Sequence, residues 1–276
     1  MNFNKVTVIG AGFMGGCFAI NLKKKKIAKS IWAVARNQQR VRQINKLNIF
    51  DKVITNLESA VDNAEVVVLA TPVSAIITYI EKIAPLVHKK CVVFDLGSTK
   101  REIIKKAKEF LKDNFVGCHP LCGSEKKGAA FAVDSLFEDS LCILTPLMKN
   151  RAFAITNKLF KSLGARTITL DANRHDKILG FVSALPHLLS FSLIKALPSE
   201  FSPFAAGSFK DLTRISASDS LLWADIFLSN SGNLKDAAAN LNRSIKTFLR
   251  IIEKNDRAKL ISLLRAVNQK HKRLIE

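Results

Sequence analysis

Residues 6 to 15 read V-T-V-I-G-A-G-F-M-G, an apolar run that ends in three closely spaced glycines. Glycines at this spacing allow a tight turn between a strand and a helix, and they let the backbone approach a pyrophosphate closely. The free N–H groups at the start of the following helix then bind the anionic phosphates. The stretch therefore predicts a dinucleotide-binding turn whose contacts come from Gly10, Gly12, Phe13, Met14 and Gly15.

Short β-branched runs alternate with helical stretches as far as residue 170. The runs lie at residues 6–10, 66–70, 91–95, 142–145 and 165–170, and the helix before the last run ends at Gly164. Continuous apolar strands separated by helices are typical of a parallel sheet with helices on both faces. We therefore predict an α/β Rossmann dinucleotide-binding domain over residues 1–170, followed by an all-α helical domain over residues 171–276.

The helical half has many apolar positions at helical spacing, over residues 178–197, 221–228, 241–252 and 258–267. Because such a segment often buries them against a second copy of itself, we predict a homodimer through this half. Residues 178–197 are about as long as a membrane-spanning helix, but they contain Pro186, His187 and Lys195, and no second apolar span accompanies them. We interpret this stretch as a buried central helix and predict no membrane partner.

The composition is that of a globular protein, with 276 residues of which 48% are hydrophobic and 24% charged. The unusual value is the formal net charge of +20, from 43 Lys and Arg against 23 Asp and Glu. The basic residues are spread over many predicted helix faces, and no nucleic-acid-binding module is evident. We therefore predict no nucleic-acid partner. A positive field favours encounter with an anionic substrate and cofactor.

Five cysteines, at 17, 91, 118, 122 and 142, form no C-x-x-C pair. The odd count, without a secretory leader, indicates reduced thiols in a cytoplasmic protein. Cys118, His119 and Cys122 could form part of a zinc site, but no fourth ligand follows at a familiar spacing. We therefore predict no metal.

The second predicted strand, S-I-W-A-V-A-R-N at residues 30–37, bears on the choice of cofactor. An acidic residue at its end would accept from the ribose 2′-hydroxyl of NAD, but Ala35 stands there, and residues 16–50 contain nine basic residues and no Asp or Glu. Arg36 can bond to a 2′-phosphate and stack on adenine. We predict NADP as the preferred cofactor, with NAD as the alternative if Arg36 is only a surface charge. Thr71 and Pro72, after the strand at 66–70, are predicted to border the cofactor.

Residues 117 to 128 read G-C-H-P-L-C-G-S-E-K-K-G. A histidine followed by proline and flanked by glycines predicts a tight loop that holds one imidazole against a substrate. Because imidazole titrates near neutrality, His119 can take a proton at working pH, and we predict it as the catalytic base. The alternative is a structural histidine bonded to a backbone carbonyl.

Three later stretches complete the pattern: D-L-G-S-T-K at 95–100, L-G-F-V-S-A-L-P-H-L-L-S-F at 179–191, and A-A-G-S-F-K-D-L-T-R-I-S-A-S-D-S-L-L-W-A-D-I-F-L-S-N at 205–230. Together with the His119 segment they resemble the prephenate and arogenate dehydrogenases of tyrosine biosynthesis, in order and over nearly the whole chain. The resemblance implies a Rossmann domain, a helical dimerisation domain, and oxidative decarboxylation of a cyclohexadienol to a 4-hydroxyphenyl product with hydride transfer to NAD(P).

The resemblance also implies which residues contact the reacting hydroxyl. His119 matches the histidine that draws off the hydroxyl proton as hydride leaves. Ser98 matches the serine that bonds the same hydroxyl and helps to hold the imidazole. An alternative role for Ser98 is that of helix N-cap, since it precedes a helical run that begins at Lys100.

Other substrate contacts follow from the same resemblance. Arg214 matches the arginine that clamps a substrate carboxylate, for which a planar guanidinium has paired donors. His187 corresponds to a polar residue near the substrate, although a satisfied core histidine is the alternative. Ser124 and Glu125 follow His119 in the same segment and are predicted to line the pocket.

The residues leave the substrate open between prephenate and arogenate, which differ by one keto oxygen against one ammonium. Because an ammonium needs an acidic neighbour and the predicted pocket is basic, we favour prephenate, with arogenate as the alternative. Another two-domain dehydrogenase would lack the H-P-x-x-G segment. A non-catalytic cofactor-sensing protein would be expected to have lost one of His119, Ser98 and Arg214, and all three are present.

Overall fold

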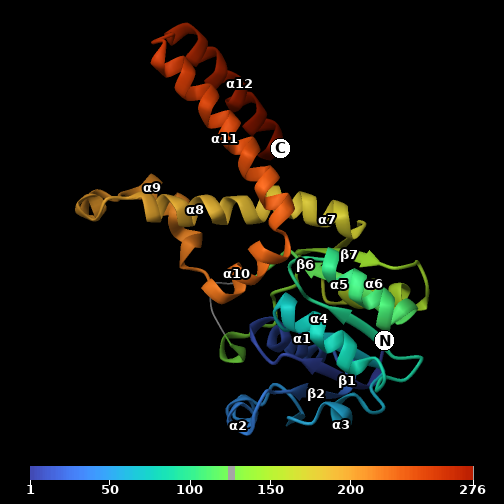
Figure 1. Cartoon of the computed structure of the whole chain (residues 1–276). Helices are drawn as coiled ribbons and strands as arrows, with labels where there is room; N and C mark the ends of the chain where they lie inside the picture. The colour runs from blue at the N-terminus through green and yellow to red at the C-terminus, as the bar shows by residue number, and fades with distance from the viewer. Residues whose placement is uncertain (124–127, 276) are drawn as a thin grey trace.

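The computed structural model describes residues 1–123 and 128–275 of the chain. Strands and helices alternate in its first part, and its second part is helical (Figure 1). The strands are β1 (Phe3–Ile9), β2 (Ala28–Val34), β3 (Lys52–Ile54), β4 (Val66–Leu69), β5 (Val92–Asp95), β6 (Phe115–Pro120), β7 (Leu141–Pro146) and β8 (Arg166–Thr169). The helices among them are α1 (Phe13–Lys24), α2 (Gln38–Asn45), α3 (Leu57–Val61), α4 (Val73–Ile83), α5 (Arg101–Phe110) and α6 (Arg151–Ser162).

The second part begins after β8. Its helices are α7 (Ala172–Leu179), α8 (Leu185–Ala196), α9 (Gly207–Thr213), α10 (Ser220–Ser229), α11 (Ser231–Glu253) and α12 (Arg257–Ile275). A π-helical turn, η3 (Gly180–Ala184), joins α7 to α8, and the 3-10 turn η5 (Arg214–Ala217) follows α9. α11 and α12 form a hairpin that projects away from the sheet (Figure 1). The prediction of a Rossmann sheet followed by helices is confirmed.

The strands form one sheet in the order β3-β2-β1-β4-β5-β6-β7-β8. The first six strands in this order are parallel, as in other Rossmann domains. The prediction of a parallel sheet is wrong at β7, which pairs antiparallel to β6. A parallel return needs a crossover connection, usually a helix, and the described part of the link between β6 and β7 contains only the short turn η2 (Ala129–Phe131). α6 does supply a crossover, and β8 accordingly runs parallel to β7.

Strand β6 contains the G-C-H-P segment, which the sequence predicts as a loop. The segment is extended because Cys118 is fully buried and pairs with Leu144 of β7. His119 is therefore held near the end of a strand, opposite Ile143, rather than in a loop.

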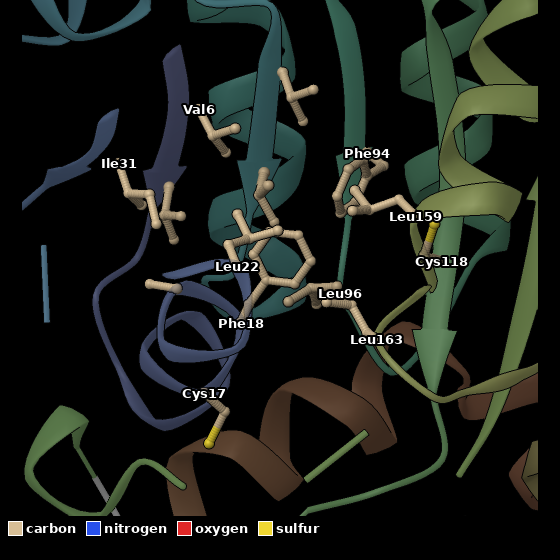
Figure 2. Close-up of a cluster of buried hydrophobic side chains, with 14 of the residues drawn as sticks. Val6, Cys17, Phe18, Leu22, Ile31, Phe94, Leu96, Cys118, Leu159 and Leu163 are labelled. Atoms are coloured by element: carbon tan, nitrogen blue, oxygen red, sulfur yellow. The ribbon is translucent and has the colours of Figure 1, made fainter. Parts of the chain in front are cut away.

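Helices cover both faces of the sheet. On one face, the rings of Phe18 in α1 and Phe160 in α6 each lie 5.6 Å from the ring of Phe94 in β5, and Figure 2 shows Phe18 and Phe94 within this cluster. On the other face, Ile76 of α4 and Ile103 of α5 are fully buried in a second cluster. Packing on both sides holds the strands in place, and the parallel pairing of β1 to β6 brings their carboxyl ends to one edge.

The turn between β1 and α1 needs glycine at two positions. Gly10 has a φ of +106°, and a Cβ there would lie 2.7 Å from the backbone of Ala70. A Cβ on Gly15 would lie 2.2 Å from the carbonyl oxygen of Gly10. Gly12 differs, because a Cβ there would meet nothing within 4 Å. The backbone at Gly12 therefore faces open space at the uncapped N-terminus of α1, where a pyrophosphate could approach.

α7, η3 and α8 run as one apolar helix over Ala172–Ala196. Pro186 has no N–H to donate to the preceding turn, and the π-helical turn accommodates the missing bond. The helix is long and apolar enough to cross a membrane, which is weak evidence by itself. Only 22% of its most apolar window is buried. The prediction that residues 178–197 are a buried helix is therefore wrong for a single chain.

Two carboxylates from the helical part cap helices of the sheet part. Asp176 of α7 accepts hydrogen bonds from the backbone N–H groups of Lys100 and Arg101, at 2.7 and 2.9 Å, where α5 begins. Asp225 of α10 accepts one from the backbone N–H of Ser74, at 3.0 Å, in the first turn of α4. A carboxylate at a helix N-terminus satisfies free donors and complements the helix dipole. The two caps set how the helical part lies on the carboxyl edge of the sheet.

Two alanine substitutions separate cofactor binding from folding. In Gly12→Ala the new methyl group meets no protein atom, so we expect an unchanged melting temperature but cofactor binding weakened about tenfold or more, measured by titration calorimetry. In Gly15→Ala the clash with Gly10 lowers the free energy of unfolding by about 1–3 kcal/mol. Undiminished cofactor affinity in Gly12→Ala would show that no pyrophosphate lies against this turn.

Candidate active site

His119 lies near the end of β6 and is held from the helical part of the chain. Its Nδ1 is 2.9 Å from Nε2 of His175, which is fully buried in α7. The two rings are tilted by 54°, with centroids 5.1 Å apart. The partner of His119 is therefore a second imidazole rather than a backbone carbonyl.

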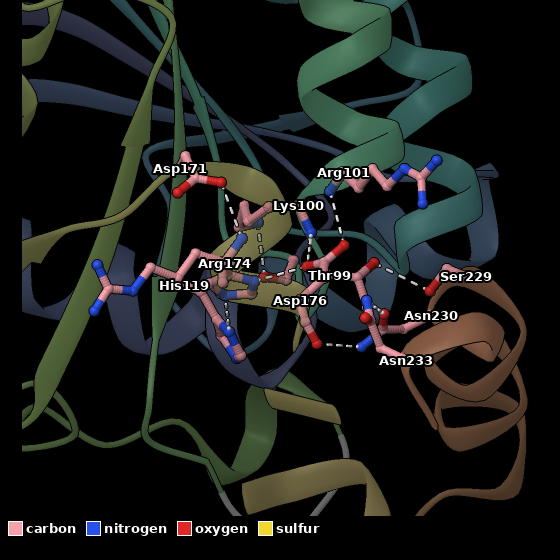
Figure 3. A network of polar contacts seen from close by, with 12 residues as sticks. Thr99, Lys100, Arg101, His119, Asp171, Arg174, Asp176, Ser229, Asn230 and Asn233 are labelled. Atoms are coloured by element: carbon pink, nitrogen blue, oxygen red, sulfur yellow. Dashed lines mark hydrogen bonds and ion pairs between the residues drawn. The ribbon is translucent and has the colours of Figure 1, made fainter. Parts of the chain in front are cut away.

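His175 is in turn held by a capping carboxylate. Its Nδ1 lies 2.7 Å from Oδ1 of Asp176, which also accepts from the backbone N–H groups of Lys100 and Arg101. Asn230, between α10 and α11, donates from its Nδ2 to the backbone carbonyl of Asp176 at 2.8 Å, which fixes this turn of α7. Figure 3 shows His119, Asp176 and Asn230 in one polar network at the start of α5.

A buried ion pair lies beneath this network. The ammonium of Lys100 contacts the carboxylate of Asp95, and both side chains are fully buried. Lys100 also donates to the carbonyl of Gly97 at 2.8 Å, while Asp95 accepts from the backbone N–H groups of Gly97 and Cys118, at 2.8 and 3.2 Å. These bonds tie the turn after β5, which carries Ser98, to strand β6, which carries His119.

Burial sets the electrostatics of both histidines. It lowers the pKa of His119 well below the ordinary value of 6.5, and the nearby His175 and Lys100 add to the effect. Burial also lowers the pKa of His175, although Asp176 partly opposes this. Both imidazoles are therefore neutral near pH 7, and His119 is free to accept a proton.

Ser98 lies in the turn after β5 and is half-buried. The N-cap interpretation is wrong, because α5 begins later and its capping acceptor is Asp176. Within residues 1–123 and 128–275, Ser98 makes no hydrogen bond to His119. The imidazole is held by His175 instead, and the hydroxyl of Ser98 remains available to a ligand.

His187 and Arg214 lie on two neighbouring elements of the helical part, α8 and η5. His187 is half-buried in α8, with its ring stacked on Trp223 at 3.5 Å between centroids, and its Nδ1 donates to the carbonyl of Ser183 at 3.0 Å. Burial lowers its pKa, so Nε2 carries a lone pair near pH 7. Arg214 is exposed at the start of η5, which packs against α8. No carboxylate pairs with Arg214 in the part of the chain that the structure describes.

The predicted cofactor residues follow three neighbouring strands. The glycine turn follows β1, Arg36 follows β2 and is exposed, and Thr71 and Pro72 follow β4. The Oγ1 atom of Thr71 is buried without a hydrogen-bond partner among the described residues. With the open space at Gly12, this unsatisfied hydroxyl fits a dinucleotide at the carboxyl edge of the sheet.

The strand order brings these segments beside the candidate base. β1, β4, β5 and β6 are successive neighbours, so the glycine turn, Thr71, Ser98 and His119 share one edge. Ser124 and Glu125 lie outside the described residues. Among residues 1–123 and 128–275, no group of three His, Cys, Asp or Glu side chains could hold a metal ion.

Sequence reasoning missed the residues behind His119. His175 and Asp176 lie in A-N-R-H-D-K, a polar stretch that gives no sign of burial, yet both are at most 1% exposed. Lys100 is fully buried as well, although lysine is rarely found inside a protein. An adjacent His and Asp at the start of a helix was the available signal, and without the fold nothing links that pair to His119.

Comparison with known proteins identifies both parts of the chain. The family model for the prephenate dehydrogenase nucleotide-binding domain matches residues 18–169, and the model for the prephenate dehydrogenase dimerization domain matches residues 171–266. Prephenate dehydrogenase of Bacillus subtilis is 31% identical over 93% of this chain and 72% of its own length. Prephenate dehydrogenase of Lactococcus lactis is 33% identical over 91% of this chain and 72% of its own length.

A solved structure agrees over the whole fold. Prephenate dehydrogenase from Aquifex aeolicus, in complex with hydroxyphenyl propionate and NAD+, is 29% identical and superposes with a TM-score of 0.91 over 98% of each chain. Sequence, domain order and fold thus lead to the same conclusion: the chain belongs to the prephenate dehydrogenase family and is an NAD(P)-dependent oxidoreductase.

Proposed function

We propose that this protein converts prephenate to 4-hydroxyphenylpyruvate and carbon dioxide with transfer of hydride to NAD(P). The observation that carries the proposal is the neutral His119, held through Nδ1 at the carboxyl edge of the sheet, beside the glycine turn. The names of the similar enzymes from B. subtilis and L. lactis support prephenate as substrate.

In this reaction His119 is the base. A bound nicotinamide supplies the hydride acceptor. Nε2 of His119 accepts the proton of the ring hydroxyl while hydride departs from the same carbon, so that carbon becomes a carbonyl. Loss of carbon dioxide then sends the bonding electrons through the ring to the carbonyl oxygen, which regains its proton from the His119 imidazolium and becomes the hydroxyl of a phenol. A positioned base of this kind contributes about 10²- to 10⁴-fold in rate.

We assign the substrate contacts to three further residues. Ser98 bonds the reacting hydroxyl from the turn after β5, since its own hydroxyl has no hydrogen-bond partner within the described residues. Arg214 binds a substrate carboxylate with its paired donors. His187, held rigid by Trp223, presents Nε2 to the substrate. Ser124 and Glu125 stay predicted pocket residues.

For the cofactor we propose a preference for NADP over NAD. Arg36 is exposed immediately after β2, and Ala35 is buried where an acid would oppose a 2′-phosphate. Arg40 follows in the first turn of α2 and adds positive charge. Charge-assisted bonds to phosphate are among the strongest polar contacts, so this edge favours the additional phosphate.

We further propose a cytoplasmic homodimer in which residues 1–170 bind the cofactor and residues 171–276 form the interface. The five cysteines are free thiols, which fits a reducing compartment. Apolar side chains are exposed along both helices of the α11–α12 hairpin, at Ile245, Leu249, Ile252, Ile261, Leu264 and Val267. Stripes at helical spacing on both helices are suited to packing against a second copy.

The substrate is tested by following reduced-cofactor absorbance with prephenate and with arogenate. We expect prephenate to be turned over with the higher kcat/KM. His119→Asn should keep the fold and the cofactor affinity but lower kcat roughly a thousandfold, because the asparagine cannot take the proton. Unchanged turnover in His119→Asn refutes the base, and a higher kcat/KM with arogenate refutes the proposed substrate.

Cofactor preference is tested with Arg36→Ala, compared with Arg42→Ala on the exposed face of α2 as a control. We expect Arg36→Ala to raise the KM for NADP about 10- to 100-fold and to leave the KM for NAD unchanged, because only the contact with the 2′-phosphate is lost. Arg42→Ala should change neither value. A tenfold preference of the unmodified enzyme for NAD would contradict the assignment of Arg36.

The assembly is tested by sedimentation at micromolar concentration, where we expect a species of about twice the 30.5 kDa chain mass. Replacing Leu249 and Ile252 together by glutamate places charges on the apolar stripe and should give monomers. Lys246→Glu, on the same helix but outside the stripe, is the matched control and should remain dimeric. A monomeric unmodified protein would remove the proposed interface.

A further inference from the structure

The proposed reaction uses His119 but gives no role to the buried pair behind it. His175 and Asp176 are at most 1% exposed and face no solvent, so their protons can be assigned from the hydrogen bonds alone. Asp176 is the fixed point. Both of its oxygens accept from backbone N–H groups, Oδ1 from Lys100 and Oδ2 from Arg101. Two N–H donors at the positive end of a helix favour the ionised carboxylate, which can only accept hydrogen bonds.

The proton between Asp176 and His175 must then lie on the imidazole. Nδ1 of His175 is 2.7 Å from Oδ1, and this atom donates because the carboxylate cannot. In a neutral imidazole one nitrogen donates and the other accepts. Nε2 of His175 is therefore bare and can only accept.

The same rule also determines which nitrogen of His119 carries its proton. Its Nδ1 is 2.9 Å from the bare Nε2 of His175, so Nδ1 carries the proton and donates. Nε2 of His119 is then the bare nitrogen, which is the atom a base needs. The opposite arrangement would place a bare Nδ1 of His175 against a carboxylate lone pair at 2.7 Å, which buried groups do not tolerate.

We propose that His175 is a positioning residue that holds His119 in the tautomer with Nδ1 protonated and Nε2 bare, and that Asp176 fixes the tautomer of His175. The bonding order is Asp176 to His175 to His119, and it begins at the N-terminus of α5. Its catalytic consequence rests on the proposed function.

The arrangement also stabilises the charge that forms in turnover. When Nε2 of His119 gains the hydroxyl proton, the ring becomes an imidazolium with protons on both nitrogens. Its Nδ1–H still points at the lone pair of His175, whose other nitrogen faces the anionic Asp176. Each ring keeps its own proton in this step. The negative charge of the Asp176 carboxylate stabilises the transient imidazolium of His119, as the carboxylate of a catalytic triad stabilises its histidine.

Because His175 and Asp176 belong to α7 whereas His119 belongs to β6, the base is completed only where the two parts of the chain meet. The cap on α5 and the orientation of His119 are consequently one structural feature. Displacement of α7 would free Nδ1 of His119 and leave its tautomer unspecified.

The tautomer is measured directly by NMR of the full-length protein labelled with ¹⁵N-histidine, with NADP bound, at neutral pH. Correlation between ring nitrogens and ring protons distinguishes a protonated nitrogen from a bare one. The signals of His119 and His175 are identified by their loss in His119→Asn and His175→Gln, and His271→Gln on exposed α12 is the control. We expect Nδ1 protonated and Nε2 bare in both rings. A bare Nδ1 on His119 overturns the proposal, whatever the enzyme turns over.

Two variants then measure the effect on catalysis. Glutamine at 175 can place an amide oxygen near the position of Nε2 and keep a hydrogen bond to His119, whereas asparagine is too short to do so. We expect kcat to fall roughly a hundredfold in His175→Asn and about tenfold in His175→Gln, with KM changed less than about threefold in both. The ¹⁵N spectrum of His175→Asn should show His119 exchanging between tautomers.

The two failures are distinguishable. Normal kcat in folded, cofactor-binding His175→Asn overturns the positioning role, as does an equal loss in both variants accompanied by loss of cofactor binding. Absence of turnover of prephenate and arogenate by the unmodified protein refutes the proposed function, and the ¹⁵N spectrum still decides the tautomer.

Discussion

The structure depends on the carboxylate of Asp176 at the N-terminus of α5. This group satisfies two backbone donors of a sheet-domain helix from within the helical part, and it is at most 1% exposed. Removing such a cap costs about 0.5–2 kcal/mol at a surface position, and removing a buried acceptor adds the penalty of unsatisfied donors. Oδ1 of Asp176, which accepts from Lys100, also orients His175. The interaction that joins the two parts of the chain therefore also sets the position of His119.

A second buried contact adjoins this cap, because Lys100 takes part in both. The pair between Lys100 and Asp95 is fully buried, and such pairs add little net stability compared with apolar residues, although losing one partner costs about 3–5 kcal/mol. The ion pair acts here by positioning the backbone around the site. Through Gly97 and Cys118 it ties the turn that carries Ser98 to the strand that carries His119. The ammonium also helps to keep the pKa of His119 low, so the base is neutral when substrate arrives.

Local sequence patterns predicted the parts of the fold that depend on local rules. The glycine turn, the alternation of strands and helices, and the helix that ends at Gly164 all follow from spacing and backbone conformation, and Gly164 indeed has a φ of +96°. The direction of β7 was missed because it depends on the link from β6, whose described part contains no crossover helix. Strand β6 was missed because the glycine and proline around His119 suggest a loop, while its pairing with β7 comes from distant residues.

The candidate site likewise contains some residues that local sequence patterns identify and others that they miss. Ser98 follows the predicted strand at 91–95, so its placement at the ligand-binding edge could be anticipated, and the motif around His119 marked that residue as the candidate base. His175 and Asp176 could not be anticipated, since burial in the fold, rather than a local pattern, makes a surface-like A-N-R-H-D-K stretch into part of the site. The apolar helix Ala172–Ala196 is the opposite case. Its sequence predicts burial, but the helix remains largely exposed in a single chain.

The central claim is that the imidazole of His119, held at Nδ1 by His175, takes the hydroxyl proton of the substrate. A crystal structure of the complex with NADP and the product 4-hydroxyphenylpyruvate tests it most directly. The account predicts the phenol oxygen within about 2.6–3.2 Å of Nε2 of His119, with Nδ1 still bonded to His175. A phenol oxygen bound elsewhere, or a His119 ring turned so that His175 no longer contacts Nδ1, would contradict it.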